Sequence, residues 1–452
     1  MKRPPKKRPQ DTNRPANQQA LIPRRSFICR VTALGLLPLT QAPGQASGTD
    51  EAPGAGAAQN WPGESDAGYW RWIRQQFSIP PDEAYFNSGT LGACPRQVLD
   101  AVVDSMRDTE KTIAQYDYRS EHTEYIVGYR AQEDLRKKAG GILNATAGEI
   151  ALVQNATMAI NFIANGLELK PGDEVLITDQ EHPGSQGPWD LRAKRQGIVV
   201  KKLVIPIPTP DPQTVLKIFA DAIGPRTRVI AVPHITSHYG IVMPVREICG
   251  LAGERAVFTL VDGAQAVGQS RVDVKMIGCD AYATSPHKWL LAPPGTGLLY
   301  VREGRERDIW ATLASAHWDD YEPASGLFRL MQYGTGNKAL QDGLDAALDF
   351  YLRVGPEKIE RRTIGLADSL RNGLQKIKGV TISSPLHPEL AGAIVTYGVA
   401  GVTGWELQDE LWNRKKYRVR AGGPNVRQSV HLYNSPEEIE GTLEVVRMLA
   451  AK

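Results

Sequence analysis

Short apolar runs alternate with amphipathic stretches from about residue 130 onward. Runs rich in Val, Ile and Leu are typical of buried strands, and an apolar period near 3.6 is typical of helices. A mostly parallel sheet in an α/β fold is indicated when strands and helices alternate in this way. We predict strands at 174–178, 198–200, 203–205, 228–232, 256–261, 280–284 and 297–301, and helices at 157–167, 213–223 and 245–252.

The first 46 residues form a leader of different character. Arg24 and Arg25 lie in Pro-Arg-Arg-Ser-Phe-Ile, which resembles the twin-arginine export motif. The uncharged segment 31–42 follows, and then Gly-Gln-Ala at 44–46 as a small-residue cleavage site. Basic, apolar and small-residue parts in this order indicate a secretory signal. We expect the twin-arginine machinery as a partner and the periplasm as the destination.

The domain organisation follows from this leader and from a change of pattern near residue 340. A chain of 452 residues is long for one core, so a large and a smaller domain are expected. Beyond about residue 340, a long helical pattern leads into an α+β segment. We predict a signal peptide at 1–46, a linker at 47–66, a large domain with its N-terminal arm at 67–340, and a small domain at 341–452.

Charge and composition exclude several classes of function. The net charge is +3, but residues 1–46 carry +8, so the remainder carries −5. A mildly acidic body does not fit a nucleic-acid-binding protein. No segment has the length of uncharged apolar sequence that crosses a bilayer, so no membrane span is expected in the mature form. Four cysteines without a C-x-x-C pair indicate free thiols, and no metal site is predicted.

Two charged residues fall where an α/β sheet places its ligands. Asp262 ends the strand 256–261, and Lys288 follows another strand-like run 26 residues later. Ligands of open α/β sheets sit at the carboxyl ends of strands. Pyridoxal 5′-phosphate (PLP) needs an amine to bond its aldehyde and a carboxylate to keep its pyridine nitrogen protonated. Its phosphate suits the helix start at 155–158, where backbone N–H groups are free, with Ser285 and His287 as further donors.

These motifs resemble a known family. Val-Asp-Gly-Ala-Gln at 261–265 and Ser-Pro-His-Lys at 285–288 resemble the two signatures of class V aminotransferase-fold enzymes. This fold-type I group includes cysteine desulfurases, isopenicillin N epimerase and kynureninase. The resemblance covers roughly residues 80–445, including a first strand at 85–89 and a last strand-to-helix turn at 433–438. It implies a seven-stranded, mostly parallel sheet in a large domain beside a smaller α+β domain.

The resemblance also implies roles for individual residues. Lys288 is implied to carry PLP and to move protons, and Asp262 to pair with the pyridine nitrogen. His182 is implied to stack on the ring and to take part in catalysis. The other positions implied to contact the cofactor are Gln265 at the ring hydroxyl, Thr157, Ser285 and His287 at the phosphate, Ala156 and Met158 beside them, and His234.

The substrate and the partner subunit are implied in the same way. Arg420 or Arg427 is implied to bind a substrate carboxylate, because the guanidinium fork matches it, and Arg420 is the preferred candidate. Asn87 is a further substrate-binding candidate. Thr335 lies in a Gly-Thr-Gly segment that resembles the one reaching the phosphate of a neighbouring subunit. A homodimer with shared active sites is therefore expected.

Two other classes of protein compete with this interpretation. Ser285 to Lys288 also fits the S-x-x-K motif of penicillin-binding proteins, but S-D-N and K-T-G partners are absent from the sequence. The residues after Lys288 include Pro-Pro-Gly and do not continue as the helix that this motif opens. A non-enzymatic exported binding protein on the same fold is the remaining alternative.

The reaction itself stays open at this stage. Desulfurases use a cysteine shortly after the Arg-x-Gly segment, and this chain has no cysteine beyond Cys279. Transamination, decarboxylation and epimerization of the isopenicillin N epimerase type remain, the last with His182 or a residue of 237–239 on the second face. Exported members of this branch resemble the periplasmic PLP enzyme that modifies the glutamyl group of the siderophore pyoverdine. An amino-acid moiety of a secreted metabolite is thus the expected substrate.

Overall fold

A computed structural model describes residues 68–115, 131–315, 317–322 and 325–451, all within one compact unit. The predicted signal peptide and linker lie outside these residues. The helices are α1 Tyr69–Arg74, α2 Arg96–Thr112, α3 Glu133–Gly141, α4 Ala156–Gly166, α5 Pro183–Gln196, α6 Pro212–Ala222, α7 Val245–Gly253, α8 Val274–Ile277, α9 Lys338–Val354, α10 Pro356–Leu374, α11 Gly404–Lys415 and α12 Pro436–Ala450. The strands are β1 Ala84–Tyr85, β2 Ile150–Val153, β3 Glu174–Thr178, β4 Val199–Leu203, β5 Thr227–Pro233, β6 Phe258–Asp262, β7 Ala281–Thr284, β8 Gly297–Val301, β9 Val380–Ile382, β10 Ile394–Val399, β11 Tyr417–Arg418, β12 Arg420–Gly422 and β13 Asn425–Ser429.

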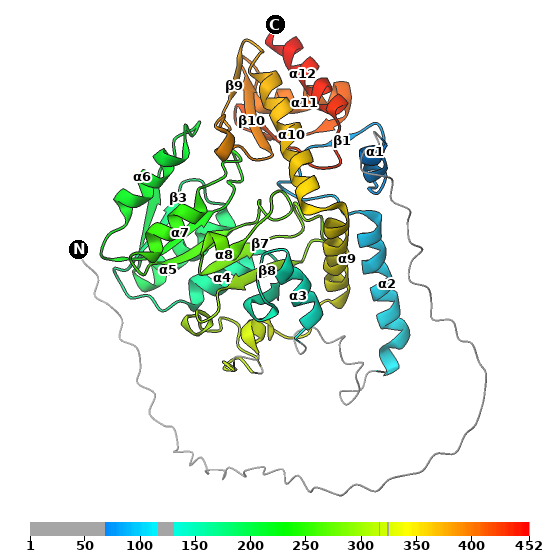
Figure 1. Cartoon of the computed structure of the whole chain (residues 1–452). Helices are drawn as coiled ribbons and strands as arrows, with labels where there is room; N and C mark the ends of the chain where they lie inside the picture. The colour runs from blue at the N-terminus through cyan, green and yellow to red at the C-terminus, as the bar shows by residue number, and fades with distance from the viewer. Residues whose placement is uncertain (1–67, 116–130, 316, 323–324, 452) are drawn as a thin grey trace, which may run out of the picture. The chain divides into compact units, whose positions relative to one another are not determined.

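A seven-stranded sheet forms the centre of the larger part, in the order β2-β8-β7-β6-β5-β3-β4. Strands β4, β3, β5, β6 and β7 run parallel to one another, whereas β8 runs antiparallel to β7 and β2. Helices α4 and α7 contact the sheet, and Figure 1 shows it among α4 to α8. The predicted mostly parallel α/β fold is confirmed.

Two strand boundaries differ from the prediction. In place of two strands at 198–200 and 203–205 there is one strand, β4, which covers Val199–Leu203 and leaves Val204 and Ile205 outside. Strand β6 begins at Phe258 because Ala256 has a φ of 52° and the Val257 N–H still bonds to the end of α7 at Ala252. A left-handed residue turns the chain and cannot continue a strand.

A second hydrophobic core lies in the carboxyl-terminal part. Strands β12-β13-β10-β9 form an antiparallel sheet, and α10, α11 and α12 bury residues against it. Figure 1 shows these three helices beside β9 and β10. Helix α9 spans the predicted boundary at 340 and contributes Leu344, Leu348 and Phe350 to the first core. The division at residue 340 stays a prediction.

The segment from Ala84 to Gly92 connects the two cores at the place where Lys288 lies. Strand β1 pairs in parallel with β11 of the carboxyl-terminal part. The Gly92 N–H donates to the carbonyl of His287 at 2.8 Å. A β-carbon at Gly92 would lie 2.0 Å from the Lys288 carbonyl oxygen, so only glycine fits there. Among the described helices, none is long and apolar enough to cross a membrane.

Candidate active site

Asp262 and Lys288 come from neighbouring strand ends. Asp262 is the last residue of β6 and pairs in register with Ala283 of β7, and Lys288 follows β7 in the next loop. The Asp262 carboxylate is buried and accepts the Ala264 N–H at 2.9 Å. Burial raises the pKa of Asp262, and the Lys288 ammonium opposes this shift. The two predicted residues therefore interact electrostatically in one site.

The Lys288 amine loses its proton more readily than an ordinary lysine amine. Burial lowers its pKa to about 8; the Asp262 carboxylate opposes this, whereas Arg427 and Arg420 lower the pKa further. A neutral amine is the nucleophilic form, so a lowered pKa increases the reactive fraction near neutral pH. A carboxylate and an amine arranged in this way match the two groups that PLP requires.

Gln265 is held in place by the loop that contains Gly89 and by Trp289, which follows Lys288. Its side-chain amide donates to the Gly89 carbonyl at 2.9 Å, and its oxygen accepts the Trp289 indole N–H at 2.7 Å. Both contacts are buried. Its predicted contact with the cofactor's ring hydroxyl stays a prediction.

The predicted phosphate cradle lies at the start of α4. Asn155 caps the helix by accepting the Met158 N–H, so the Met158 amide is already used. The Ala156 N–H donates to Ser285 Oγ at 3.0 Å, which joins the helix start to the Lys288 loop. Thr157 is exposed at the same helix end, where the positive end of the helix dipole favours an anion.

Two further features fit a bound phosphate. His287 Nδ1 is buried without a partner among the described residues, a state that costs free energy unless a ligand or water satisfies it. Gly184 starts α5 so close to Thr157 that a β-carbon would lie 2.3 Å from Thr157 Oγ1. The chain's own groups therefore fit PLP: an amine, a buried carboxylate and a helix amino end with a buried donor nearby.

His182 is exposed at the amino end of α5, where its Nδ1 accepts the Gly184 N–H at 3.1 Å. Burial of part of the ring and the Lys288 charge lower its pKa, while Asp262 opposes them. Its neighbour Glu181 accepts hydrogen bonds from Thr178 and Ser185, and burial together with Asp262 raises its pKa to about 8. Glu181 is thus protonated at neutral pH and adds no charge beside Asp262.

Arg427 and Asn87 lie together, and Arg420 lies beside them. The Arg427 guanidinium is buried and donates to the Ser237 carbonyl at 2.8 Å, to Asn87 Oδ1 at 2.9 Å and to Thr90 Oγ1 at 2.7 Å. Arg420 is exposed on the adjacent strand, directly opposite Arg427. Burial, followed by the Arg420 charge, lowers the pKa of Arg427 to about 9.

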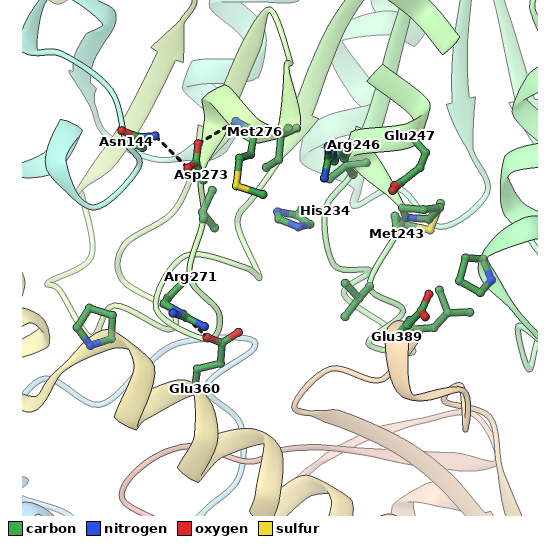
Figure 2. A pocket seen from close by; sticks show the side chains of 18 of the residues that line it. Asn144, His234, Met243, Arg246, Glu247, Arg271, Asp273, Met276, Glu360 and Glu389 are labelled. Carbon is green, nitrogen blue, oxygen red and sulfur yellow. Dashed lines mark hydrogen bonds and ion pairs between the residues drawn. The ribbon is translucent and has the colours of Figure 1, made fainter. Parts of the chain in front are cut away.

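The main-chain N–H of His234 donates to the Asp262 carbonyl at 2.8 Å, but the His234 ring does not point toward the other site residues. Its ring bonds to the Tyr282 hydroxyl at 2.8 Å, and Tyr282 pairs with Val261, so both rings lie on the sheet face opposite to Asp262. The ring lines a separate cavity of about 870 Å³. Figure 2 shows it there, between Met243 and Met276. Burial lowers the pKa of His234 to about 4.

Thr335 is exposed in the loop before α9. Its predicted contact with the phosphate of a partner subunit stays a prediction, as does the dimer itself.

Sequence reasoning missed several residues that position the site. Thr90 and the Ser237 carbonyl hold Arg427, and Glu181 supports the His182 turn. Tyr282 was missed as the partner of His234. Of these residues, only Thr90 could have been found from the sequence, because it lies three residues after Asn87 in a turn.

The site and fold define a class of protein, and comparisons identify its family. The model of the aminotransferase class-V family matches residues 86–443. Isopenicillin N epimerase of Amycolatopsis lactamdurans is 31% identical over 400 residues, covering 84% of this chain and 98% of that protein. A probable cysteine desulfurase of Methanothermobacter thermautotrophicus is 27% identical over 408 residues, covering 84% and 97%. The chain belongs to the aminotransferase class-V family, whose enzymes depend on PLP.

Solved structures show the same fold. A C-DES mutant with glycine covalently linked to its PLP cofactor superposes with a TM-score of 0.74 at 23% identity, covering 83% of this chain and 99% of that one. An apo cysteine desulfurase of Thermococcus onnurineus gives a TM-score of 0.72 at 24% identity, covering 84% and 98%.

Proposed function

We propose that this chain is an exported enzyme that carries PLP on Lys288 and acts at the amino group or α-carbon of an amino-acid moiety. The observation that carries the proposal is the pair of the half-buried Lys288 and the buried Asp262 at neighbouring strand ends, with an amine whose pKa is lowered to about 8. PLP, when bound, supplies a ring that withdraws electrons from the substrate's α-carbon. Asp262 holds a proton on the pyridine nitrogen by its negative charge.

The chain's other residues orient and move protons. The start of α4, with Ser285 and His287, would hold the phosphate of PLP, and His182 would cover one face of its ring. Lys288 Nζ, once released by the substrate amine, takes a proton from the α-carbon and returns it. We assign the substrate α-carboxylate to Arg427 instead of the initially preferred Arg420. Arg427 is fixed by three neutral partners and perturbs the Lys288 amine more strongly.

Epimerization is the second candidate reaction. It needs a proton carrier on each face of the α-carbon, and Lys288 serves one face. His182 and His238 both interact electrostatically with Arg420 and Arg427, and their lowered pKa values leave them neutral at pH 7. The 31% identity to isopenicillin N epimerase supports this candidate.

We also propose where the enzyme acts and which kind of molecule it modifies. The twin-arginine leader supports transport of the folded, cofactor-loaded chain to the periplasm. There the enzyme modifies an amino-acid moiety of a secreted metabolite such as a siderophore. Two copies of the chain form a dimer in which Thr335 of each copy completes the other's site; sedimentation of a monomer at micromolar concentration would contradict this part.

The test begins with the purified protein. We expect visible absorbance that borohydride abolishes, with the reduced cofactor found on Lys288 by mass spectrometry. Incubation with amino acids and siderophore precursors in D₂O then separates the reactions: deuterium at an α-carbon of inverted configuration marks epimerization, a keto product marks transamination, and loss of CO₂ marks decarboxylation. Lys288→Ala should abolish all three, whereas Lys275→Ala, at an exposed position of α8, should abolish none. A colourless protein that does not take up PLP would refute the proposal.

A further inference from the structure

A row of polar side chains crosses the four-stranded sheet β12-β13-β10-β9 and faces the proposed site. Arg420 of β12 is opposite Arg427 of β13, which is opposite Thr396 of β10. Residues directly opposite in antiparallel strands project on the same face. This face docks on the segment after β5, because Arg427 donates to the Ser237 carbonyl and Thr396 Oγ1 donates to the His238 carbonyl at 2.5 Å.

A pocket of about 240 Å³ opens between this row and His238. Its nine lining residues include two arginines and a histidine, and none is acidic. Binding sites for drug-sized ligands span roughly 300–1,000 Å³, so this volume suits the end of a small substrate. The pocket is therefore a compact cationic site.

The opposed arginines are unfavourable in the free protein. Like charges directly opposite on two strands repel each other, and the partners of Arg427 are all neutral. Arg427 Nε is buried without a partner, and no hydrogen bond or ion pair holds the Arg420 side chain within the described residues. Neither guanidinium group has an anionic partner in the protein. A ligand that carries anionic groups would supply these partners.

One carboxylate cannot neutralise both arginines. Asp262 is the sole acid that perturbs the Lys288 amine among the described residues, and it is committed to the cofactor's pyridine nitrogen. The α-carboxylate of a simple amino acid satisfies Arg427, the buried one. Arg420, on the edge strand and exposed, then still faces the pocket without a counter-charge.

We infer that the substrate of this site carries a second carboxylate, bound by Arg420 beside His238, in addition to the α-carboxylate bound by Arg427. The inference rests on the proposed function and narrows its substrate class to amino-acid moieties with an acidic side chain. Arg420 is then the residue that determines specificity, because it contacts the group that distinguishes an acidic from a neutral side chain.

Calorimetric titration of the PLP-loaded protein tests the inference with two unreactive probes. Glutarate and pentanoate both have five carbons, and only glutarate has a second carboxylate. We expect glutarate to bind at least about 10-fold more tightly, the size expected for a charge-assisted hydrogen bond. Arg420→Gln should lower the glutarate affinity to that of pentanoate and leave pentanoate binding unchanged.

Arg414→Gln is the matched control, because Arg414 is exposed on neighbouring α11 and paired with Glu410. It should alter neither affinity. Equal affinities of the unaltered protein for the two probes, or an Arg420→Gln protein that still prefers glutarate, would overturn the inference. Both results are separate from failure of the proposed function, which is seen as absence of PLP on Lys288 before any probe is added.

Discussion

At the scale of single residues, a substitution at Asp262 tests cofactor binding and catalysis separately. Asp262→Asn keeps an oxygen that can accept the Ala264 N–H but removes the charge that stabilises a protonated pyridine nitrogen. We expect PLP to stay bound, since Lys288 and the α4 start are unchanged, and kcat to fall by at least about 100-fold. Absorbance and steady-state kinetics measure the two effects.

The control for that substitution is Asp221→Asn, which also replaces an aspartate by asparagine but at an exposed position of α6. It should leave kcat within about twofold. If Asp262→Asn retained full kcat, the role of Asp262 at the pyridine nitrogen would be wrong even though PLP binds.

The pKa of Lys288 predicts how fast the apoprotein captures PLP at each pH. Burial lowers this pKa to about 8, so roughly a tenth of the amine is neutral at pH 7, against well under a thousandth for an ordinary lysine. The neutral amine reacts, so the capture rate should rise with pH, with a midpoint near 8, and level off above it. Stopped-flow absorbance from pH 6 to 10 measures the profile.

The sign of each neighbour's effect gives a stricter test of the same profile. Asp262 raises the pKa of Lys288 and Arg420 lowers it. Asp262→Asn should therefore move the midpoint to lower pH, and Arg420→Gln should move it to higher pH. Shifts in the opposite directions would mean that the amine is not placed between these charges.

At the scale of elements, the loop that contains Gly92 must fit against the loop that carries Lys288. In Gly92→Ala the new methyl group would overlap the Lys288 carbonyl oxygen at 2.0 Å, while the Gly92 N–H still has to reach His287. We expect the free energy of unfolding to fall by about 1–3 kcal/mol, as for overpacking, together with weaker PLP binding. Urea denaturation and PLP titration check the two effects.

Gly250→Ala provides the comparison, because Gly250 lies within α7 with open space around its β-carbon position. Removing a helical glycine should raise the free energy of unfolding by about 0.5–1 kcal/mol. Equal effects of the two substitutions would show that the contact between the two loops imposes no constraint.

Elements also show what the sequence could predict and what it could not. The strands of the central sheet are apolar runs between turns, and Asp262 and Lys288 follow two of them, so the strand-end rule alone brings these residues together. Strand register decides the rest. It places Arg427 inside and Arg420 at the edge, and it turns His234 to the opposite face with Tyr282. These placements depend on which strands, far apart in the sequence, pair with one another, and a local residue pattern does not give that pairing.

At the scale of the whole molecule, the proposed cofactor and the proposed export route depend on the same property, a chain that is already folded. An enzyme whose site is built from distant segments, such as Asn87, Lys288 and Arg427, holds PLP only when folded. The twin-arginine route carries folded proteins, so it would deliver the chain with its cofactor already in place.

The leader makes this testable without disturbing the site. Changing Arg24 and Arg25 together to Lys keeps the positive charge but removes both guanidinium groups, so it tests recognition of the pair itself. We expect the unaltered chain in the periplasmic fraction, shortened by about the 46 leader residues, and the double variant at full length in the cytoplasm, still loaded with PLP. Arg14→Lys, in the same leader, should be exported normally. Equal export of the double variant would refute the twin-arginine route, and a full-length cytoplasmic form of the unaltered chain would remove the basis for a secreted substrate.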